Sequence, residues 1–219
     1  IFIHWGGSHS TKNYTGGYET IKKEKVNDID GMSGGELFSR DTSRKVSSEH
    51  RGVLNGKKIK KAIEKKGYRT ELNDSSFSPL HFNSTVAPAG ADGATSVGVK
   101  FSDRTDTRKF TYNAEDGKYS TNDWEKKVKF QNLIILKAES TYITVPYKGS
   151  TTTYLNYKWN SGSGKYISNG TATDITWEVA DGKLVLKDAV GNTLSVNKGK
   201  SYIGFVSSNH NGKITCSAE

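Results

Sequence analysis

The chain has 219 residues, a net charge of +9 and an apolar fraction of 33%. This length suffices for one large domain or two small ones, and eleven tyrosines, eight phenylalanines and four tryptophans favour an aromatic-rich β protein over a disordered chain. No apolar run approaches the ~20 residues of a membrane-spanning helix, and the single cysteine excludes an intramolecular disulfide or a cysteine-based metal cluster.

Residues 1–10 form an apolar run that ends in glycines, serines and two histidines. A β-branched and aromatic run bounded by glycine is typical of a buried strand that leads into a loop. Because the sequence begins inside this strand, we expect it to be cut from a longer protein, with the strand completing a sheet of a missing N-terminal region. An edge strand exposed in this way would favour a homodimer.

Residues 18–26 have the apolar spacing of a short helix, and residues 27–31 then indicate a surface turn. Placing Gly31 at the invariant glycine of an EF-hand puts Val26 and Leu37 at the first and last ligand positions. Those positions require oxygen ligands, so an EF-hand calcium loop is excluded.

The clearest helix is predicted over residues 57–66, between a cap at Asn55 and a stop at Gly67. Its apolar residues share one face, and six lysines cover the rest: Lys57, Lys58, Lys60, Lys61, Lys65 and Lys66. The helix lies in a basic segment, residues 40–69, which holds eleven Lys or Arg against three acids. These lysines are either a solvated face or the contact surface for an anionic partner.

Residues 85–95 are rich in alanine, glycine and proline. They are interpreted as a flexible connection between an α/β part, residues 1–84, and an antiparallel β domain, residues 96–219. The predicted strands of that domain are 96–101, 110–112, 118–119, 128–136, 154–159, 164–167, 174–179, 183–186, 193–196 and 201–206.

The strand spacing predicts an antiparallel β meander or a partly closed barrel. The chain as a whole is therefore expected to have an α+β, predominantly β fold with a short helical N-terminal part. Residues 128–136 end as a continuous apolar run, which is typical of a central strand covered on both faces.

Three parts of the chain resemble the YerB-like family of bacterial putative lipoproteins, whose function is unknown. The first is the hydrophobic-His-x-Gly-Gly-Ser pattern at residues 3–8. The second combines Phe38, Arg40, Asp41 and Arg44, although the proline that the family has next is absent and only a displaced His50 follows. The third comprises Asn132 before an apolar strand, a Gly-Ser-Gly turn at 162–164, Gly170 with Trp177, a hairpin from Asp188 to Gly191, and Gly199 with Tyr202 and Ile203.

The resemblance implies that a second domain precedes this portion. It also implies that the full-length protein is extracytoplasmic and anchored to the membrane as a lipoprotein. The expected partners are the missing N-terminal domain and either an anionic cell-wall polymer or another envelope protein. The family supplies no known activity.

Six polar residues form the candidate ligand-binding site: His4, Ser8, His9, Arg40, Asp41 and Arg44. Guanidinium groups bind carboxylate or phosphate bidentately, and paired glycines leave backbone N–H groups available to an anion. The alternatives are a core histidine bonded to backbone and an Arg40–Asp41 ion pair that holds the loop.

The sequence contains no hydrolase, nucleotide-binding or zinc motif, so no catalytic residue, cofactor or metal ligand is assigned. Cys216 has no identified base and is interpreted as a tail residue. The tryptophans Trp5, Trp124, Trp159 and Trp177 would support sugar stacking only as an exposed pair.

We therefore expect a non-catalytic binding or scaffold module of the cell envelope. The first alternative is a cell-wall-acting enzyme that uses His4 or His9 together with Asp41. The second is a binder of nucleic acid or another anionic polymer through residues 40–69. Nucleic acid is the less favoured of these ligands, because the helix lacks the interleaved aromatic residues of a base-stacking platform.

Overall fold

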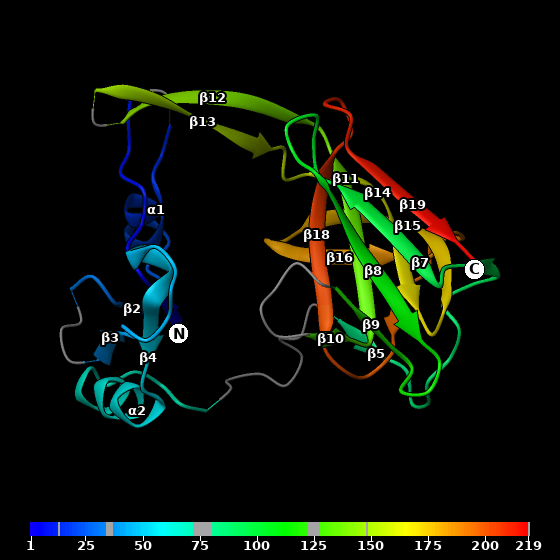
Figure 1. The fold of residues 1–219 in the computed structure, drawn as a ribbon, viewed down its shortest axis with the longest axis horizontal. Helices are drawn as coiled ribbons and strands as arrows, with labels where there is room; N and C mark the ends of the chain where they lie inside the picture. The colour runs from blue at the N-terminus through cyan, green and yellow to red at the C-terminus, as the bar shows by residue number, and fades with distance from the viewer. Residues whose placement is uncertain (13, 34–36, 72–79, 122–127, 148, 219) are drawn as a thin grey trace. The chain divides into compact units, whose positions relative to one another are not determined.

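The computed structural model describes residues 1–12, 14–33, 37–71, 80–121, 128–147 and 149–218. The chain divides into two compact units (Figure 1). Unit 1 comprises Ile1–Ser75 and Val145–Thr152, and unit 2 comprises Ser76–Thr144 and Thr153–Glu219. Residues 85–95, the predicted connection, lie within unit 2.

Unit 1 combines two helices with short strands. Its elements are β1 (Phe2–His4), α1 (Gly17–Lys23), β2 (Asp28–Asp30), β3 (Phe38–Arg40), a 3-10 helix (Ser48–Arg51), β4 (Gly52–Leu54) and α2 (Gly56–Lys65). β1 and β2 pair in parallel, and β3 and β4 pair antiparallel. Both predicted helices are confirmed, and the side chain of Asn55 caps α2 by accepting from the backbone N–H groups of Lys57 and Lys58.

A small apolar core of Ile29, Phe38 and Ile59 holds unit 1 together. The predicted turn at residues 27–31 is wrong, because Asp28–Asp30 forms β2 with Ile29 pointing into this core. The first strand is also less buried than predicted. Phe2 keeps 49% of its surface exposed, since β1 has a described partner on one side only.

The strands after residue 80 are numbered β5 to β19. They are β5 (His81–Phe82), β6 (Asp92–Gly93), β7 (Ser96–Lys100), β8 (Thr107–Asn113), β9 (Lys118–Ser120), β10 (Lys129–Phe130), β11 (Asn132–Ala138), β12 (Ser140–Tyr147), β13 (Ser150–Tyr157), β14 (Ser161–Ser168), β15 (Thr171–Ala180), β16 (Lys183–Lys187), β17 (Ser195–Val196), β18 (Ser201–Ser207) and β19 (Lys213–Ser217).

Two sheets make up most of unit 2 (Figure 1). One has the order β10-β9-β8-β7-β19, and the other has the order β16-β15-β14-β11-β18, with β6 beside β15. All these pairs are antiparallel except β11 with β18, which run parallel. The predicted α+β, predominantly β class is confirmed, and the parallel pair is the departure from a simple meander.

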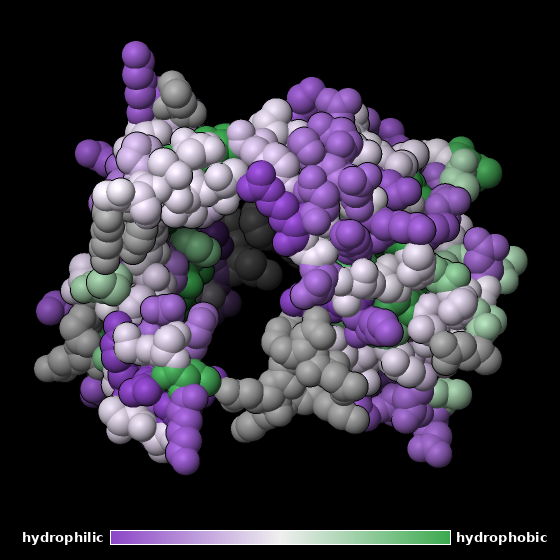
Figure 2. Space-filling view, turned by 45° about the horizontal axis from the view of Figure 1, so that its top comes forward, coloured by the Kyte–Doolittle hydropathy of each residue, from purple (hydrophilic) through white to green (hydrophobic). Residues whose placement is uncertain are grey.

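β11 lies at the centre of unit 2. Leu133 and Ile135 face the cluster between the two sheets, whereas Ile134 and Leu136 face a second cluster around Trp177. All four aliphatic side chains are fully buried, which confirms the predicted strand covered on both faces. Hydrophilic side chains predominate on the face of unit 2 that Figure 2 shows, and the hydrophobic ones form small separate groups.

Two local predictions in unit 2 are wrong. The Gly-Ser-Gly segment at residues 162–164 is not a turn but part of β14, where both glycines permit a close backbone approach. A Cβ atom at Gly162 would lie 2.2 Å from the carbonyl oxygen of Lys137, and one at Gly164 would lie 2.6 Å from that of Ile135. Cys216 is not a tail residue, because it lies in β19 opposite Val97. No described helix is long and apolar enough to cross a membrane.

Candidate functional site

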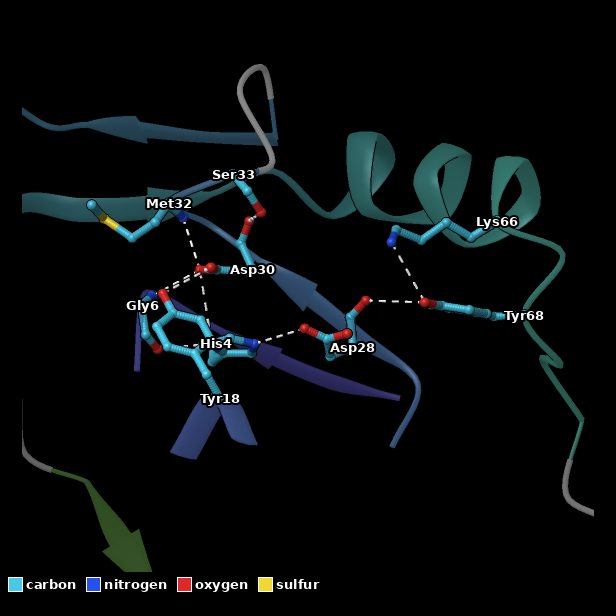
Figure 3. A network of polar contacts seen from close by, with 9 residues as sticks. All are labelled: His4, Gly6, Tyr18, Asp28, Asp30, Met32, Ser33, Lys66 and Tyr68. Atoms are coloured by element: carbon cyan, nitrogen blue, oxygen red, sulfur yellow. Dashed lines mark hydrogen bonds and ion pairs between the residues drawn. The ribbon is translucent and has the colours of Figure 1, made fainter. Parts of the chain in front are cut away.

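His4 is fixed by acceptors on both ring nitrogens (Figure 3). Its Nδ1 lies 2.8 Å from the carbonyl oxygen of Gly6, and its Nε2 lies 3.0 Å from Oδ2 of Asp28. A carbonyl oxygen only accepts, so Nδ1 carries a proton, and the carboxylate favours a second proton on Nε2. The side chain is 8% exposed. Neither ring nitrogen is left free to act as a base in this arrangement.

Asp30 is the second centre of the same network (Figure 3). Its Oδ1 accepts from the backbone N–H groups of Gly6, at 2.8 Å, and Met32, at 2.9 Å. Its Oδ2 accepts from the hydroxyl group of Tyr18 at 3.0 Å. The N–H group of Gly6 is thus bonded within unit 1, although the paired glycines were predicted to leave backbone donors for a ligand.

The network shifts both titrating groups. Burial lowers the pKa of His4, but its bonds to Asp28 and Gly6 and the charge of Asp30 outweigh this effect and raise the pKa above its ordinary value. Burial raises the pKa of Asp30, but the bonds from Met32, Gly6 and Tyr18 and the charge of His4 bring it below its ordinary value. The folded unit therefore favours an imidazolium ion next to carboxylates.

We expect the stability of unit 1 to fall on both sides of mildly acidic pH. Because the pKa of His4 is raised, its contribution is complete below the unfolded value of about 6.5 and is lost as the pH rises through the folded pKa. The contribution of Asp30 is present above about pH 4 and is lost as the pH falls through its lowered pKa. Amide exchange of β1 and β2 between pH 4 and pH 9, corrected for intrinsic exchange rates, measures the loss of stability at high pH and at low pH.

The matched control for this pH dependence is His9, whose side chain is 81% exposed. His4→Gln should abolish the loss of protection at high pH, and His9→Gln should leave it unchanged. An equal pH dependence in all three proteins would contradict the role of His4.

Ser8 and His9 lie at the start of α1. The hydroxyl group of Ser8 accepts from the N–H group of Gly17 at 3.0 Å and lies 3.0 Å from that of Tyr14. The ring of His9 lies 4.9 Å from that of Tyr18, and its Nδ1 lies 3.9 Å from a carboxylate oxygen of Glu19. Ser8 therefore holds the loop to α1, while the side chain of His9 is exposed to solvent.

Arg40 is the last residue of β3, and Asp41 and Arg44 lie in the loop that follows it. The Arg40 guanidinium group lies 5.1 Å from the centre of the Trp5 ring and also donates to the carbonyl oxygen of Ser48. Asp41 accepts from the hydroxyl and backbone N–H groups of Ser43, at 2.6 Å and 3.0 Å.

Arg44 donates to the carbonyl oxygen of His50 at 2.6 Å. The bonds from Ser43 and the charge of Arg44 lower the pKa of Asp41 below its ordinary value. No described ion pair joins Arg40, His4 or His9 to Asp41. His4, Ser8 and His9 thus lie around Tyr18, whereas Arg40, Asp41 and Arg44 lie at the end of β3 and in the loop after it. No described contact joins the first three residues to Arg40 or Asp41.

Sequence reasoning missed Asp28, Asp30 and Tyr18, which complete the His4 network. The available signal was the alternation Asp-Ile-Asp at residues 28–30, which is the period of a strand with one apolar face. Tyr68 extends the network toward α2, because its hydroxyl group lies 3.3 Å from the carbonyl oxygen of Asp28 and 3.5 Å from Nζ of Lys66 (Figure 3).

The six lysines of residues 57–66 are all exposed; five of them lie in α2, and Lys66 follows its last residue. Lys66 contacts Tyr68 through its ammonium group. In the part of the chain that the structure describes, no carboxylate lies within ion-pair distance of Lys57, Lys60, Lys61 or Lys65. Their positive charge is therefore directed at solvent or at a partner.

The tryptophans that the structure describes do not form the exposed pair that sugar stacking would require. Trp159 is 62% exposed, but its neighbour Trp177 is 2% exposed and lies edge-on at 6.0 Å. Trp5 lies under Arg40, and Trp124 falls outside the described residues. Across the described part of the chain, no group of three or more metal-ligating side chains comes together.

The fold is that of a β-rich protein, and a comparison with protein families shows that it carries a domain of unknown function. Residues 97–203 match the C-terminal domain of DUF3048, a protein family of unknown function. These residues are a YerB-like domain, and the family resemblance predicted from the sequence is confirmed. The crystal structure of the YerB protein from Bacillus subtilis aligns with a TM-score of 0.67 and 21% identity, covering 98% of this chain and 70% of that chain. No curated protein sequence matches this chain.

Proposed function

We propose that the chain is a non-catalytic binding module of a bacterial cell-envelope lipoprotein, and that α2 contacts an anionic envelope polymer. The observation that carries the proposal is the lysine face of α2, four of whose charges have no described carboxylate partner. The extracytoplasmic location rests on the resemblance to the YerB-like family.

The geometry around His4 supports a non-catalytic role. A general base needs a nitrogen that can receive a proton from the substrate. Both ring nitrogens of His4 face acceptors within unit 1, and the carboxylate of Asp41 is bonded to Ser43. His4 and Asp41 are therefore engaged in holding loops, whereas His9 is exposed and no described ion pair joins it to Asp41.

The attachment of α2 supports a rigid binding face. Ile59 is buried in the core of unit 1, Asn55 caps the first turn, and Tyr68 ties the end of the helix to β2. A helix fixed at both ends presents its lysines with little loss of conformational freedom on binding.

Charge reversal on α2 tests the proposal. Lys57, Lys60, Lys61 and Lys65 are changed to glutamate, while Lys58 and Lys66 are kept because they make contacts of their own. Cosedimentation with purified bacterial cell walls should fall at least tenfold, and wild-type binding should weaken with added salt because the attraction is screened.

The matched control reverses four exposed lysines of unit 1 outside α2, namely Lys12, Lys22, Lys25 and Lys45. This protein has the same net charge as the α2 variant and should keep most of the wild-type binding. Equal losses in both variants would reduce the effect to net charge, and unchanged binding in the α2 variant would remove the proposal. Walls stripped of their anionic polymer should bind neither protein.

A further inference from the structure

Unit 2 contains a lysine-lined pocket of about 610 Å³. Three chain segments meet there: the start of β9, the start of β10 and the bend before β18. Its lining residues are Lys118, Val128, Lys129, Gln131, Lys198, Gly199 and Lys200, all of which lie within the YerB-like domain. The pocket therefore gathers four lysines from positions that are up to 82 residues apart in the sequence.

The charges in this lysine pocket are only partly compensated. Lys129 forms an ion pair with Asp116, whose pKa is lowered by that bond. No described carboxylate lies within ion-pair distance of Lys118, Lys198 or Lys200. Lysines that line one pocket carry like charges, which repel one another unless an anion or solvent lies between them. The arrangement therefore favours an anion with more than one negative charge.

Two of the lining residues, Gln131 and Gly199, fix the backbone beside the pocket. Gln131 is 9% exposed, and its side chain donates to the carbonyl oxygen of Gly117 at 3.1 Å. Gly199 has a φ of +140°, and a Cβ atom there would lie 2.6 Å from Cβ of Gln131. Glycine is thus required for the chain to pass this close to Gln131.

The backbone adds donors to the lysines. The carbonyl oxygen of Lys200 accepts from the N–H groups of Gln131 and Asn132, at 2.8 Å and 3.2 Å, which fixes the bend to the start of β11. The N–H groups of Lys198, Gly199 and Lys200 donate to no acceptor in the described part of the chain. Backbone N–H groups beside ammonium groups suit phosphate oxygens, which accept several hydrogen bonds each.

We propose that the lysine pocket binds an anion that carries two or more phosphate groups. The proposal does not depend on the α2 contact, since the pocket lies in unit 2 and α2 lies in unit 1. Lysine provides the point charges, the bend provides N–H donors, and the volume exceeds that of a single phosphate ion. The ligand is either a soluble polyphosphate or a stretch of a phosphodiester polymer.

Calorimetric titration of the full chain with tripolyphosphate tests the proposal. The triple change Lys118→Gln, Lys198→Gln and Lys200→Gln should weaken binding at least tenfold. The control changes three exposed lysines of unit 2 outside the pocket, Lys109, Lys183 and Lys213, to glutamine and should bind within twofold of the wild type. Equal weakening in both triples would overturn the proposal, as would inorganic phosphate that binds as tightly as tripolyphosphate.

Two further variants test whether tripolyphosphate binds at the lysine pocket. Asp116→Asn removes the one described carboxylate that offsets the pocket and should tighten tripolyphosphate binding two- to fivefold, and weaker binding would count against the site. The α2 variant should bind tripolyphosphate like the wild type, so the proposal for the pocket and the proposal for α2 are tested independently. If polyglycerol phosphate displaces tripolyphosphate, the ligand is assigned as a phosphodiester polymer. If tripolyphosphate stays bound, the ligand is assigned as a soluble polyphosphate. Either result upholds the phosphate site.

Discussion

Asn197→Ala is expected to lower the free energy of unfolding of unit 2 by roughly 3 kcal/mol, because it leaves several buried polar groups without partners. The side chain of Asn197 is fully buried. Its Oδ1 accepts from Asn83 and from the N–H group of Ala87, both at 3.0 Å. Its Nδ2 donates to the carbonyl oxygen of Ala87 at 2.7 Å and to the hydroxyl group of Ser168 at 2.9 Å. One amide thus fastens residues 83–87 to β14.

Chemical denaturation with hydrogen exchange measures this effect. In the Asn197→Ala protein, the amide of Ala87 should exchange much faster, and protection across residues 83–90 should drop before that of β11. The control is Asn160→Ala, an exposed position in unit 2, which should change stability by less than about 0.5 kcal/mol. Equal effects at both positions would show that the Asn197 network adds nothing to stability.

Asp30→Ala is expected to destabilise unit 1 by roughly 2 kcal/mol, since it removes three hydrogen bonds and the charge beside His4. The N–H groups of Gly6 and Met32 would lose their acceptor in a partly buried loop. Tyr18 would lose the contact that holds α1 to β2. The loop after β1 should then become mobile, and exchange at Gly6 should accelerate.

Two comparison variants sharpen the Asp30 result. Asp30→Asn keeps the acceptor for both N–H groups but removes the charge, so it should fall between the wild type and Asp30→Ala. Asp41→Ala removes an exposed carboxylate that accepts two hydrogen bonds from Ser43, and its effect should be clearly smaller. Protection of β1 and β2 in hydrogen exchange distinguishes the three, and an Asp41 effect as large as that of Asp30 would contradict the assignment.

Features that depend on near neighbours in the sequence could be predicted. The helix over α2 follows from an asparagine cap, a periodic apolar face and a terminal glycine within thirteen residues. β11 was predicted because four consecutive aliphatic residues need cover on both faces. The turn between Asp188 and Gly191 is also confirmed, as Oδ1 of Asp188 accepts from the N–H groups of Val190 and Asn192.

Features that depend on distant partners could not be predicted. The Asp-Ile-Asp segment becomes a strand only because β1, whose residues lie 26 positions earlier, pairs with it in parallel. The glycines at 162 and 164 indicate a turn until β11 is placed against them. The lysine pocket was missed for the same reason. Charge counted along the chain points to residues 40–69, whereas these lysines come together only when β9, β10 and the bend before β18 meet.

Unit 1 is built from two separate segments of the chain, and this affects when it can finish folding during synthesis. Residues 145–152, in the hairpin formed by β12 and β13, belong to the unit that otherwise ends at residue 75. A ribosome adds roughly 5–20 residues per second, so the missing piece of unit 1 is synthesised about 4–15 s after the rest. Unit 1 therefore cannot reach its complete set of contacts until much of unit 2 has been made. We expect a gene fragment that stops at residue 75 to lack the contacts that residues 145–152 make in unit 1.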